Sequence, residues 1–447
     1  MSIIKLDNFA GLLQTRTTRL LSQSNELTRA INVNSNIVGG LQKRLGYSIL
    51  GATVNAGQSI TGLAPYYKFD GTTYFLATTN DGQLFRWNGA TWGSISAALS
   101  GSTKYEMATF IDETFICGYN ETARTFDTIR NLDNLTLTTT NNLTSAPNAK
   151  IPVVFRQRLY LIGIAGRRSA FQFSAVPTSS GTVITWPVTN IVEVRTDDGE
   201  ELISGVNLAN RLVLFKNNTM HEWNENSLTQ VANIGTTSHR SVINTGSLLF
   251  FFSRSNNKKG FYAYSGGQPK LISGKIQSWV DGIANSGVGD IVGWQEGDNL
   301  IWYVGTITID QDTFSNMCIV YNLPTNTWTT YSLADVVSVA SSFVVSGAQR
   351  PYIGTSDGEV HQMAVGGDSV YSDNGTAIAS TFRLTKLDFG ASEDEKRIAQ
   401  SIFFAQNAQG LSARVRADDR RWEEIGQLTD TVNPFQGFES KGYYFEF

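Results

Sequence analysis

One pattern recurs along the chain: an apolar strand-like run, a polar turn, and a second run that ends in an aromatic or similar residue before another turn. The stretch DGQLFRWNGATW, Asp81 to Trp92, is one example, in which Phe85 and Trp87 alternate with Arg86. Because successive side chains of a strand point to opposite faces, the two aromatics are expected to pack on one side and Arg86 to point the other way. The Asn-Gly step that follows favours a tight turn, since both residues tolerate positive φ.

The pattern occurs seven times, and the end of its second run falls at Trp87, Phe126, Phe173, Trp223, Tyr264, Tyr321 and His361. These positions are on average about 46 residues apart, close to the period of a four-stranded propeller blade. A further apolar segment precedes each hairpin, and a short strand-like run often follows it. The sequence therefore predicts an all-β fold, a β-propeller of about seven irregular four-stranded blades.

Composition agrees with this fold class and limits the function. Charged residues make up 17% of the chain and aromatic residues 11%, which is typical of strands joined by tight turns. The net charge of −4 argues against a protein that coats nucleic acid. Cys117 and Cys318 lie inside apolar strand-like runs and are expected to be buried free thiols. No apolar run approaches the roughly 20 residues of a membrane helix, and we expect a soluble protein made without a signal.

The two ends do not follow the repeat. We expect an N-terminal arm over residues 1–50, a propeller over 51–364 and a small C-terminal β segment over 365–447, which could instead add strands to the propeller. Within the arm, LLSQSNELTRAINVN predicts one short helix capped by Ser24 or Asn25.

No catalytic, cofactor-binding or metal-binding residue is assigned from the sequence, and we expect the protein not to be an enzyme. The three histidines, His221, His239 and His361, are not spaced as a metal cluster. The acidic runs TDDGEE (Asp197 to Glu201) and SEDEK (Glu393 to Glu395) are expected to be solvated loops, and the Asp310-x-Asp312 pair a plain turn. Carboxylates that approach one another from different blades stay open as an alternative.

Basic doublets occur at Lys43-Arg44, Arg167-Arg168, Lys258-Lys259 and Arg420-Arg421. Scattered doublets on hairpin tips usually serve solubility, and they do not indicate a stacking platform for single-stranded nucleic acid. Weak attraction suits a passage for DNA, because a strongly basic lumen would hold the DNA and slow its exit.

The N-terminal segment resembles the opening of a known family. Its motif residues are Phe9 and Gly11, then Asn32 and Val33, then Gly40, Leu41, Lys43, Arg44, Gly46 and Tyr47. This pattern is similar to that of β-propeller virion proteins in the tails of short-tailed bacteriophages, the nozzle and packaged-DNA stabilisation group. Leu12 and Leu45 depart from it, since the family has a second Gly and a Pro there. The match covers about 45 of the 447 residues.

The resemblance implies a structural virion protein, a head-to-tail stabilisation component made in the host cytoplasm. Such a protein is expected to form a ring of identical copies around the DNA exit channel, to contact portal, adaptor or tail-fibre proteins, and to retain or pass the genome without sequence-specific binding. It has no implied cofactor. The alternative is a carbohydrate-active or glycan-binding β-propeller, and a further one is a scaffold for host proteins.

The arm is the expected assembly element because it carries apolar residues outside the repeat, namely Phe9, Leu12, Leu13, Leu20, Leu21 and Ile31. Arg16, Arg19 and Arg44 would then pair with carboxylates of a partner. The alternative is that the arm adds an outer strand which closes its own propeller.

Overall fold

The computed structural model describes residues 9, 11–12, 26–35, 40–96, 99–133, 135–138, 143–177, 184–255, 257–309, 311–345, 348–385, 387, 395–398, 400–407, 410–418, 420–436, 441–442 and 445–446. The chain forms two compact units. Unit 1 comprises Met1–Arg44, Pro324–Thr330 and Ala379–Phe447, and unit 2 comprises Leu45–Leu323 and Tyr331–Ile378. The expected boundaries of 1–50, 51–364 and 365–447 differ from this grouping, in which both units are assembled from separate parts of the chain.

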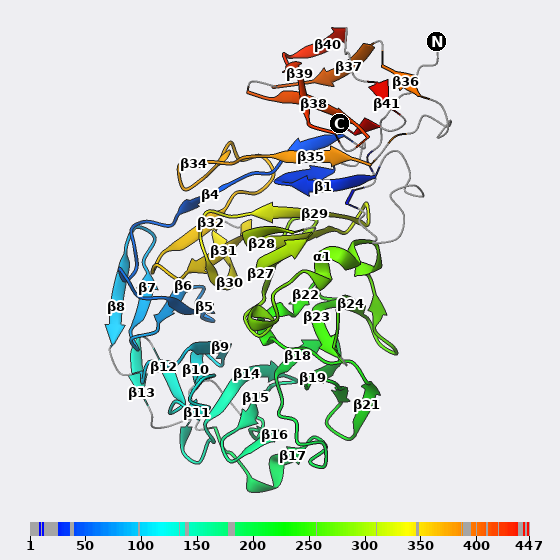
Figure 1. The fold of residues 1–447 in the computed structure, drawn as a ribbon. Helices are drawn as coiled ribbons and strands as arrows, with labels where there is room; N and C mark the ends of the chain where they lie inside the picture. The colour runs from blue at the N-terminus through cyan, green and yellow to red at the C-terminus, as the bar shows by residue number, and fades with distance from the viewer. Residues whose placement is uncertain are drawn as a thin grey trace. The chain divides into compact units, whose positions relative to one another are not determined.

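Unit 2 is a seven-bladed β-propeller, which confirms the fold class predicted from the repeat (Figure 1). Blade one contains β5 (Ile60–Tyr67), β6 (Thr73–Thr79), β7 (Leu84–Trp87) and β8 (Trp92–Ser96). Blade two contains β9 (Lys104–Phe110), β10 (Glu113–Asn120), β11 (Thr125–Phe126), β12 (Arg130–Asp133) and β13 (Thr136–Thr138). Blade three contains β14 (Ala149–Phe155), β15 (Arg158–Ile164), β16 (Arg167–Phe173) and β17 (Ile191–Glu193). Blade four contains β18 (Ser204–Leu208), β19 (Arg211–Phe215), β20 (Met220–Trp223) and β21 (Leu228–Ala232). Blade five contains β22 (Ile243–Asn244), β23 (Leu249–Ser255), β24 (Lys258–Tyr264) and β25 (Lys270–Leu271).

Blades six and seven complete the propeller. Blade six contains β26 (Val292–Glu296), β27 (Asn299–Ile309), β28 (Asp312–Asn322) and, from the end of β29 (Thr327–Ser332), Tyr331 and Ser332. Blade seven contains β30 (Val337–Val345), β31 (Ala348–Thr355), β32 (Val360–Met363) and β4 (Tyr47–Ile49). The helical segments are η2 (Val188–Asn190), η3 (His239–Ser241), η4 (Ser273–Ile276), α1 (Gln277–Asp281) and η5 (Asn285–Gly287).

The seven repeat positions lie on the third strand of successive blades, as the sequence predicts. They occur in β7, β11, β16, β20, β24, β28 and β32. Several pack between blades: Trp223 of blade four meets Phe171 of blade three with 5.5 Å between ring centroids, and Tyr321 of blade six lies 6.3 Å from Phe250 of blade five. Burial of these rings is what stabilises the contact of one blade with the next.

Truncating either ring is expected to lower the free energy of unfolding. Trp223→Ala and Tyr321→Ala should each cost about 3 kcal/mol, because each leaves a cavity between two blades. Urea unfolding followed by circular dichroism measures the change. If both variants unfold at the wild-type midpoint, the proposed role of these aromatics between blades is wrong.

The hairpin over Asp81–Trp92 has the geometry predicted for it. Phe85 and Trp87 pack against the core shared by blades one and seven, whereas the Arg86 guanidinium lies over the Tyr74 ring at 5.3 Å. Gly89 has a φ of +98°, which makes the turn. Trp92 on the outer strand lies 5.5 Å from Trp87 and so covers this edge of the blade.

The strand β4 closes the propeller. Although it comes from the N-terminal part of the chain, it pairs antiparallel with β32, with Met363 opposite Tyr47 and His361 opposite Ile49. The alternative in which the N-terminal segment adds an outer closing strand is therefore confirmed for Tyr47–Ile49. The preceding Gly46 must be glycine, because a Cβ there would lie 2.0 Å from the carbonyl oxygen of Ser372. Two short strands, β33 (Ser372–Asp373) and β34 (Thr376–Ala377), extend this sheet beyond β4.

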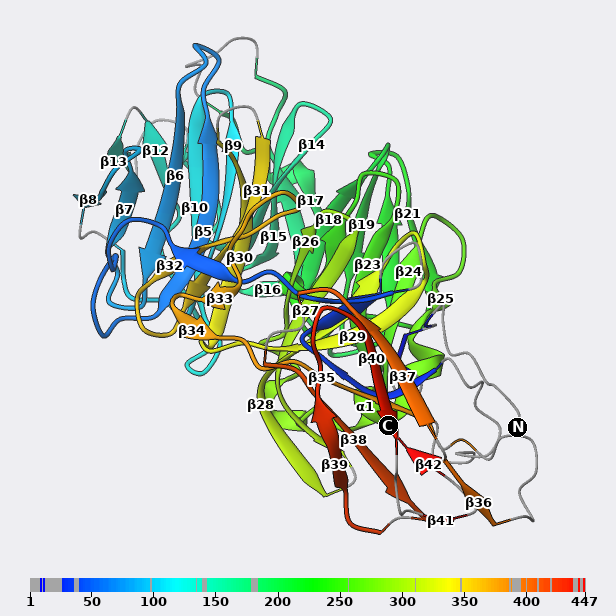
Figure 2. The ribbon, with the colours of Figure 1, turned by 90° about the horizontal axis from the view of Figure 1, so that it is seen from above.

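Unit 1 is built from both ends of the chain. Its strands are β1 (Leu27–Ile31), β2 (Val33–Ser35), β3 (Leu41–Lys43), β29 as far as Thr330, β35 (Thr381–Leu384), β36 (Lys396–Arg397), β37 (Gln400–Ala405), β38 (Ser412–Ala417), β39 (Glu423–Gln427), β40 (Thr431–Gln436), β41 (Lys441–Gly442) and β42 (Phe445–Glu446). Figure 2 shows the strands of its C-terminal part, with β37 beside β40.

The prediction of a short helix in LLSQSNELTRAINVN, Leu20 to Asn34, is wrong over the second half of this stretch. Leu27–Ile31 is the strand β1, which pairs antiparallel with β35 and meets Thr330 of β29 in parallel at Ile31. Leu27 and Ala30 are buried by this pairing, and that gain overrides local helix propensity. Ser24 and Asn25 lie outside the described residues.

Two further expectations can be compared with the structure. Cys117 and Cys318 are buried thiols outside any disulfide, as predicted. Within the described part of the chain, no helix is long and apolar enough to cross a membrane.

Candidate functional site

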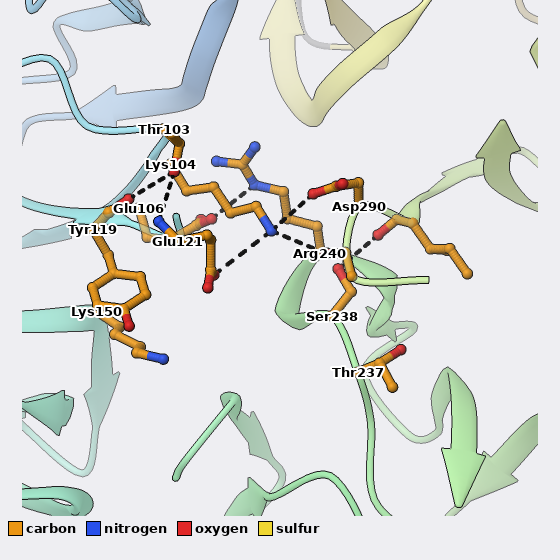
Figure 3. A network of polar contacts seen from close by, with 12 residues as sticks. Thr103, Lys104, Glu106, Tyr119, Glu121, Lys150, Thr237, Ser238, Arg240 and Asp290 are labelled. Carbon is orange, nitrogen blue, oxygen red and sulfur yellow. Dashed lines mark hydrogen bonds and ion pairs between the residues drawn. The ribbon is translucent and has the colours of Figure 1, made fainter. Parts of the chain in front are cut away.

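The propeller axis carries a network of charged side chains whose positions follow from the blade geometry. First strands of neighbouring blades contact one another around the axis, for example β5 with β9 and β9 with β14. Lys104 and Glu106 lie two residues apart on β9, so they share one face, while Tyr105 between them is buried in the core of blades one and two. Figure 3 shows Lys104 and Glu106 together with Arg240 of η3 and Asp290, which precedes β26.

Arg240 spans the axis. From blade five, its Nε donates a hydrogen bond to Glu106 Oε1 at 2.8 Å, and its Nη1 donates to the carbonyl oxygen of Ser338 in blade seven at 2.9 Å. Its Nη2 donates to the carbonyl oxygens of Thr61 in blade one, at 2.6 Å, and Tyr105 in blade two, at 3.2 Å. One guanidinium therefore ties four blades together, and its five donors in a fixed fork suit it to this task.

The segment around Arg240 also reaches blades four and six. His239 Nδ1 lies 2.8 Å from Ser204 Oγ at the start of β18, and its Nε2 lies 4.0 Å from Glu106 Oε2. Ser238 Oγ donates to the carbonyl oxygen of Ile291 at 2.8 Å, directly before β26. Residues 238–240 are thus a polar hub that joins blade five to blades one, two, four, six and seven.

The charges of the hub set the ionisation of Glu106. Burial raises the pKa of the Glu106 carboxyl, but the neighbouring Arg240 and His239 outweigh burial and hold that pKa below its usual value. Burial lowers the pKa of His239. A carboxyl whose folded pKa is depressed contributes stability above its unfolded pKa, near 4.3, and loses that contribution as the pH falls through its folded pKa. Acid below about pH 4 should therefore loosen the hub.

Lys104 forms a second link across the axis. Its Nζ donates to the carbonyl oxygen of Gly289 at 2.9 Å and lies 3.2 Å from Asp290 and 3.7 Å from Glu121 (Figure 3). Blade two is thereby joined to the segment before blade six. Together with Arg240, this contact places paired charges at the axis and links the blades there.

The run TDDGEE is not a solvated loop throughout, and that expectation is corrected. Asp198 accepts hydrogen bonds from the buried ammonium of Lys216 at 2.8 and 2.9 Å, and Glu200 accepts from the backbone N–H of Asn218 at 3.1 Å. Glu201 lies 3.3 Å from the buried ammonium of Lys150, which also lies over the Tyr119 ring. Buried lysines distant in sequence need these carboxylates as partners. Asp197 is exposed, as expected.

The three histidines lie in different parts of the propeller and have different partners. His221 Nε2 lies 3.1 Å from Thr219 Oγ1, and His361 stacks on Tyr47 with its Nε2 2.9 Å from Glu359. No group of three or more His, Cys, Asp or Glu side chains among the described residues could hold a metal ion. Asp312 begins β28, whereas Asp310, Glu393 and Asp394 lie outside the described residues.

The motif residues of the N-terminal segment have identifiable roles in unit 1. Asn32 has a φ of +58°; its Oδ1 accepts a hydrogen bond from Arg44 Nε at 2.8 Å, and its Nδ2 donates to the carbonyl oxygen of Ala379 at 2.6 Å. Gly11 has a φ of +83°, and a Cβ there would lie 2.8 Å from Thr327 Cβ. These residues fix how the N-terminal segment joins the strands of unit 1.

Two expectations about the arm are corrected by these contacts. Arg44 retains 1% of its accessible surface and binds Asn32, so it is neither a solubility feature nor available to a partner. Leu12 is equally buried, and its backbone N–H donates to the carbonyl oxygen of Trp328 in unit 1. Leu13, Arg16, Arg19, Leu20 and Leu21 lie outside the described residues.

The other basic doublets differ in their environments. Arg168 donates to the carbonyl oxygen of Arg124 at 2.9 Å, and Lys259 donates to the carbonyl oxygens of Asp281 and Ile283. Lys259 is therefore held by the backbone after α1, contrary to the expected solvent-facing role. Arg167, Lys258, Arg420 and Arg421 are exposed, as expected.

Exposed apolar side chains gather at two places. The first, the β37–β40 apolar face, consists of Ile402 and Phe404 with their cross-strand partners Pro434 and Val432, and Phe404 is 80% exposed. The second, the propeller apolar patch of unit 2, consists of Tyr67, Phe69 and Val344 on hairpins of blades one and seven. Phe69 is 76% exposed, and Val344 N–H donates to Tyr67 Oη at 3.2 Å. Such clusters usually mark interaction surfaces.

The sequence did not reveal these clusters as sites. Alternation in QSIFFA places Ile402 and Phe404 on one face of a strand, but it does not say which face is left uncovered. Arg240 likewise occurs in TSHRS without any local motif. Its partners lie about 100 or more residues away, so only the folded ring of blades brings them together.

Comparison with known proteins identifies no family for the chain. No family model matches the chain, and no curated protein sequence matches it. Solved structures similar to it include a computationally designed protein, Ika8, with 10% identity over 71% of this chain and 100% of that one, at a TM-score of 0.41. YCF48 from Cyanidioschyzon merolae has 11% identity over 70% and 98% of the two chains, at a TM-score of 0.43. The extracellular domain of a hybrid two-component system protein from B. thetaiotaomicron has 11% identity over 71% of this chain and 39% of that one, at a TM-score of 0.47.

Proposed function

We propose that this protein is a structural, non-enzymatic component of a bacteriophage tail, a nozzle or head-to-tail stabilisation protein. Identical copies form a ring around the DNA exit channel, next to portal, adaptor or fibre proteins, and the ring retains or passes the genome. The observation that carries the assembly part of this proposal is the uncovered β37–β40 apolar face. The N-terminal resemblance supplies the tail context.

The filled axis of the propeller supports the same arrangement. Arg240 links blade five to blades one, two and seven there, and Lys104 links blade two to the segment before blade six, so their side chains would obstruct nucleic acid at the axis of a single propeller. A genome channel would have to lie between copies. The net charge of −4 suits such a channel, because DNA would not be held by release of counterions.

The two apolar clusters suggest how copies join. A contact between different patches on neighbouring copies is heterologous. Such contacts form a closed ring when the rotation from one copy to the next, repeated a whole number of times, adds up to 360°. In our proposal, the β37–β40 apolar face of one copy binds the propeller apolar patch of the next. Each cluster has only three or four residues, fewer than the about 20–30 residues per partner of a stable interface. The contact therefore needs further interactions between residues around the two clusters, and the fraction of protein in oligomers should rise with protein concentration.

Substitutions in the two clusters test this proposal. Phe404→Ser and Phe69→Ser should each abolish oligomers of the purified full chain in mass photometry, because each removes the centre of one half of the contact. Val188→Ser is the matched control, since Val188 is 81% exposed but belongs to neither cluster, and it should leave the oligomers intact.

Mixing the two variants sharpens the test. A Phe69→Ser copy keeps its β37–β40 apolar face and a Phe404→Ser copy keeps its propeller apolar patch, so one intact contact should form and yield mixed dimers. Oligomers that survive both single substitutions, or a mixture that stays monomeric while the wild type assembles, would refute this contact.

A further inference from the structure

A groove in unit 1 is separate from the apolar clusters. It lies at β38 and β39, has a volume of about 770 Å³, and is lined by Arg414, Arg421, Trp422, Glu423 and Glu424. This volume is within the range of about 300–1,000 Å³ of sites that take small ligands. The pairing of the two strands places Arg414 directly opposite Glu424. Both signs of charge thus meet beside one aromatic ring.

The Trp422 ring is held in place from outside the groove. The guanidinium of Arg416, also on β38, lies over it at 5.0 Å from the ring centroid. Trp422 lines the groove, whereas Arg416 does not, so the cation–π contact fixes the ring without adding a charge to the lining. The ring is consequently a fixed platform that presents apolar surface to the groove at low entropic cost.

The charges around the ring select for neutral ligands. Two arginines and two glutamates line the groove, and their charges cancel. An anionic ligand would meet the carboxylates and a cationic one the guanidiniums, so neither gains net attraction. Each arginine offers several N–H donors in a planar fork, and each carboxylate offers two acceptor oxygens. Paired hydroxyl groups, which both donate and accept, can satisfy both kinds of side chain.

We propose that this groove binds a neutral carbohydrate. The apolar face of one sugar ring stacks on Trp422, and its hydroxyl groups bond with Arg414, Arg421, Glu423 and Glu424. The site is independent of ring assembly, because none of its residues belongs to the β37–β40 apolar face or to the propeller apolar patch. It also differs from a glycan site on the propeller, since it lies in unit 1.

Affinity electrophoresis of the full chain tests the proposal. Native gels contain one polymer each: dextran, galactomannan or xyloglucan as neutral probes, and dextran sulfate or polygalacturonate as anionic ones. We expect at least one neutral polymer to retard the wild-type protein. Trp422→Ala should weaken that retardation about tenfold or more, because it removes the stacking platform. Trp422→Tyr, which keeps an aromatic face, should restore most of it.

Controls separate binding from misfolding. Tyr371→Ser removes an exposed aromatic of the propeller and should bind like the wild type. Glu424→Gln keeps the shape of the groove and should weaken binding without a change in melting temperature. The proposal is overturned if no neutral polymer retards the protein, if only the anionic polymers do, or if Trp422→Ala binds as well as the wild type.

Discussion

Replacing Arg240 by methionine is expected to lower the free energy of unfolding by about 3 kcal/mol, as much as truncating Trp223 or Tyr321 between the blades. Methionine keeps much of the volume of arginine but removes its donors to Glu106 and to the carbonyl oxygens of blades one, two and seven. Glu106, with 21% of its side chain exposed, would then lack its main counter-charge. Urea unfolding at neutral pH followed by circular dichroism measures the loss.

Two further variants test whether the loss of stability comes from the unpaired charge of Glu106. Arg240→Met combined with Glu106→Gln should regain part of the lost stability, since the unpaired carboxylate is gone. Arg211→Met removes an exposed ion pair with Glu222 and should cost under about 1 kcal/mol. In acid, the wild type should approach the stability of Arg240→Met, because protonation of Glu106 weakens the same contact. If Arg240→Met unfolds at the wild-type midpoint, the hub does not hold the blades together.

Deleting residues 1–40 is expected to unfold unit 1 while the propeller stays closed. The deletion removes β1, which pairs with β35, and Asn32, which holds the Arg44 guanidinium. It leaves β4, the strand that closes blade seven. Limited proteolysis with mass spectrometry should therefore show cleavage within residues 379–447 that is about tenfold faster or more, with residues 45–323 still protected.

A shorter deletion is the matched control. Removing residues 1–8 retains Phe9, Gly11 and Leu12, whose contacts with unit 1 are described, and should leave the cleavage pattern unchanged. If the 1–40 deletion leaves residues 379–447 resistant to protease, the N-terminal segment is an independent arm and not a structural part of unit 1.

The propeller could be predicted from the sequence because each blade is a local unit. Its hairpins join neighbouring segments, and its aromatic residues recur at the same place in every blade, as Trp87 and Trp223 do. Such a period is visible without any knowledge of contacts. The segment around β1 was mispredicted for the opposite reason, since its partner strands lie about 300 or more residues away.

The polar interactions were missed for a different reason, since their partners are closer in sequence but no local motif marks them as buried partners. Asp198, Glu200 and Glu201 look like a solvated acidic run until Lys216 and Lys150 are placed beside them. Arg44 looks like half of a basic doublet, yet its partner Asn32 buries it. Charge in a sequence predicts exposure only when no buried partner of opposite charge approaches from elsewhere in the fold.

Electron microscopy of the purified full-length protein tests the central claim most directly. The account predicts closed rings of about six or twelve copies with an open centre, in which density fills the axis of each propeller at Arg240 and Lys104. Neighbouring copies should meet through the β37–β40 apolar face. A protein that stays monomeric at every concentration, or rings in which an open channel runs through each propeller, would contradict the account.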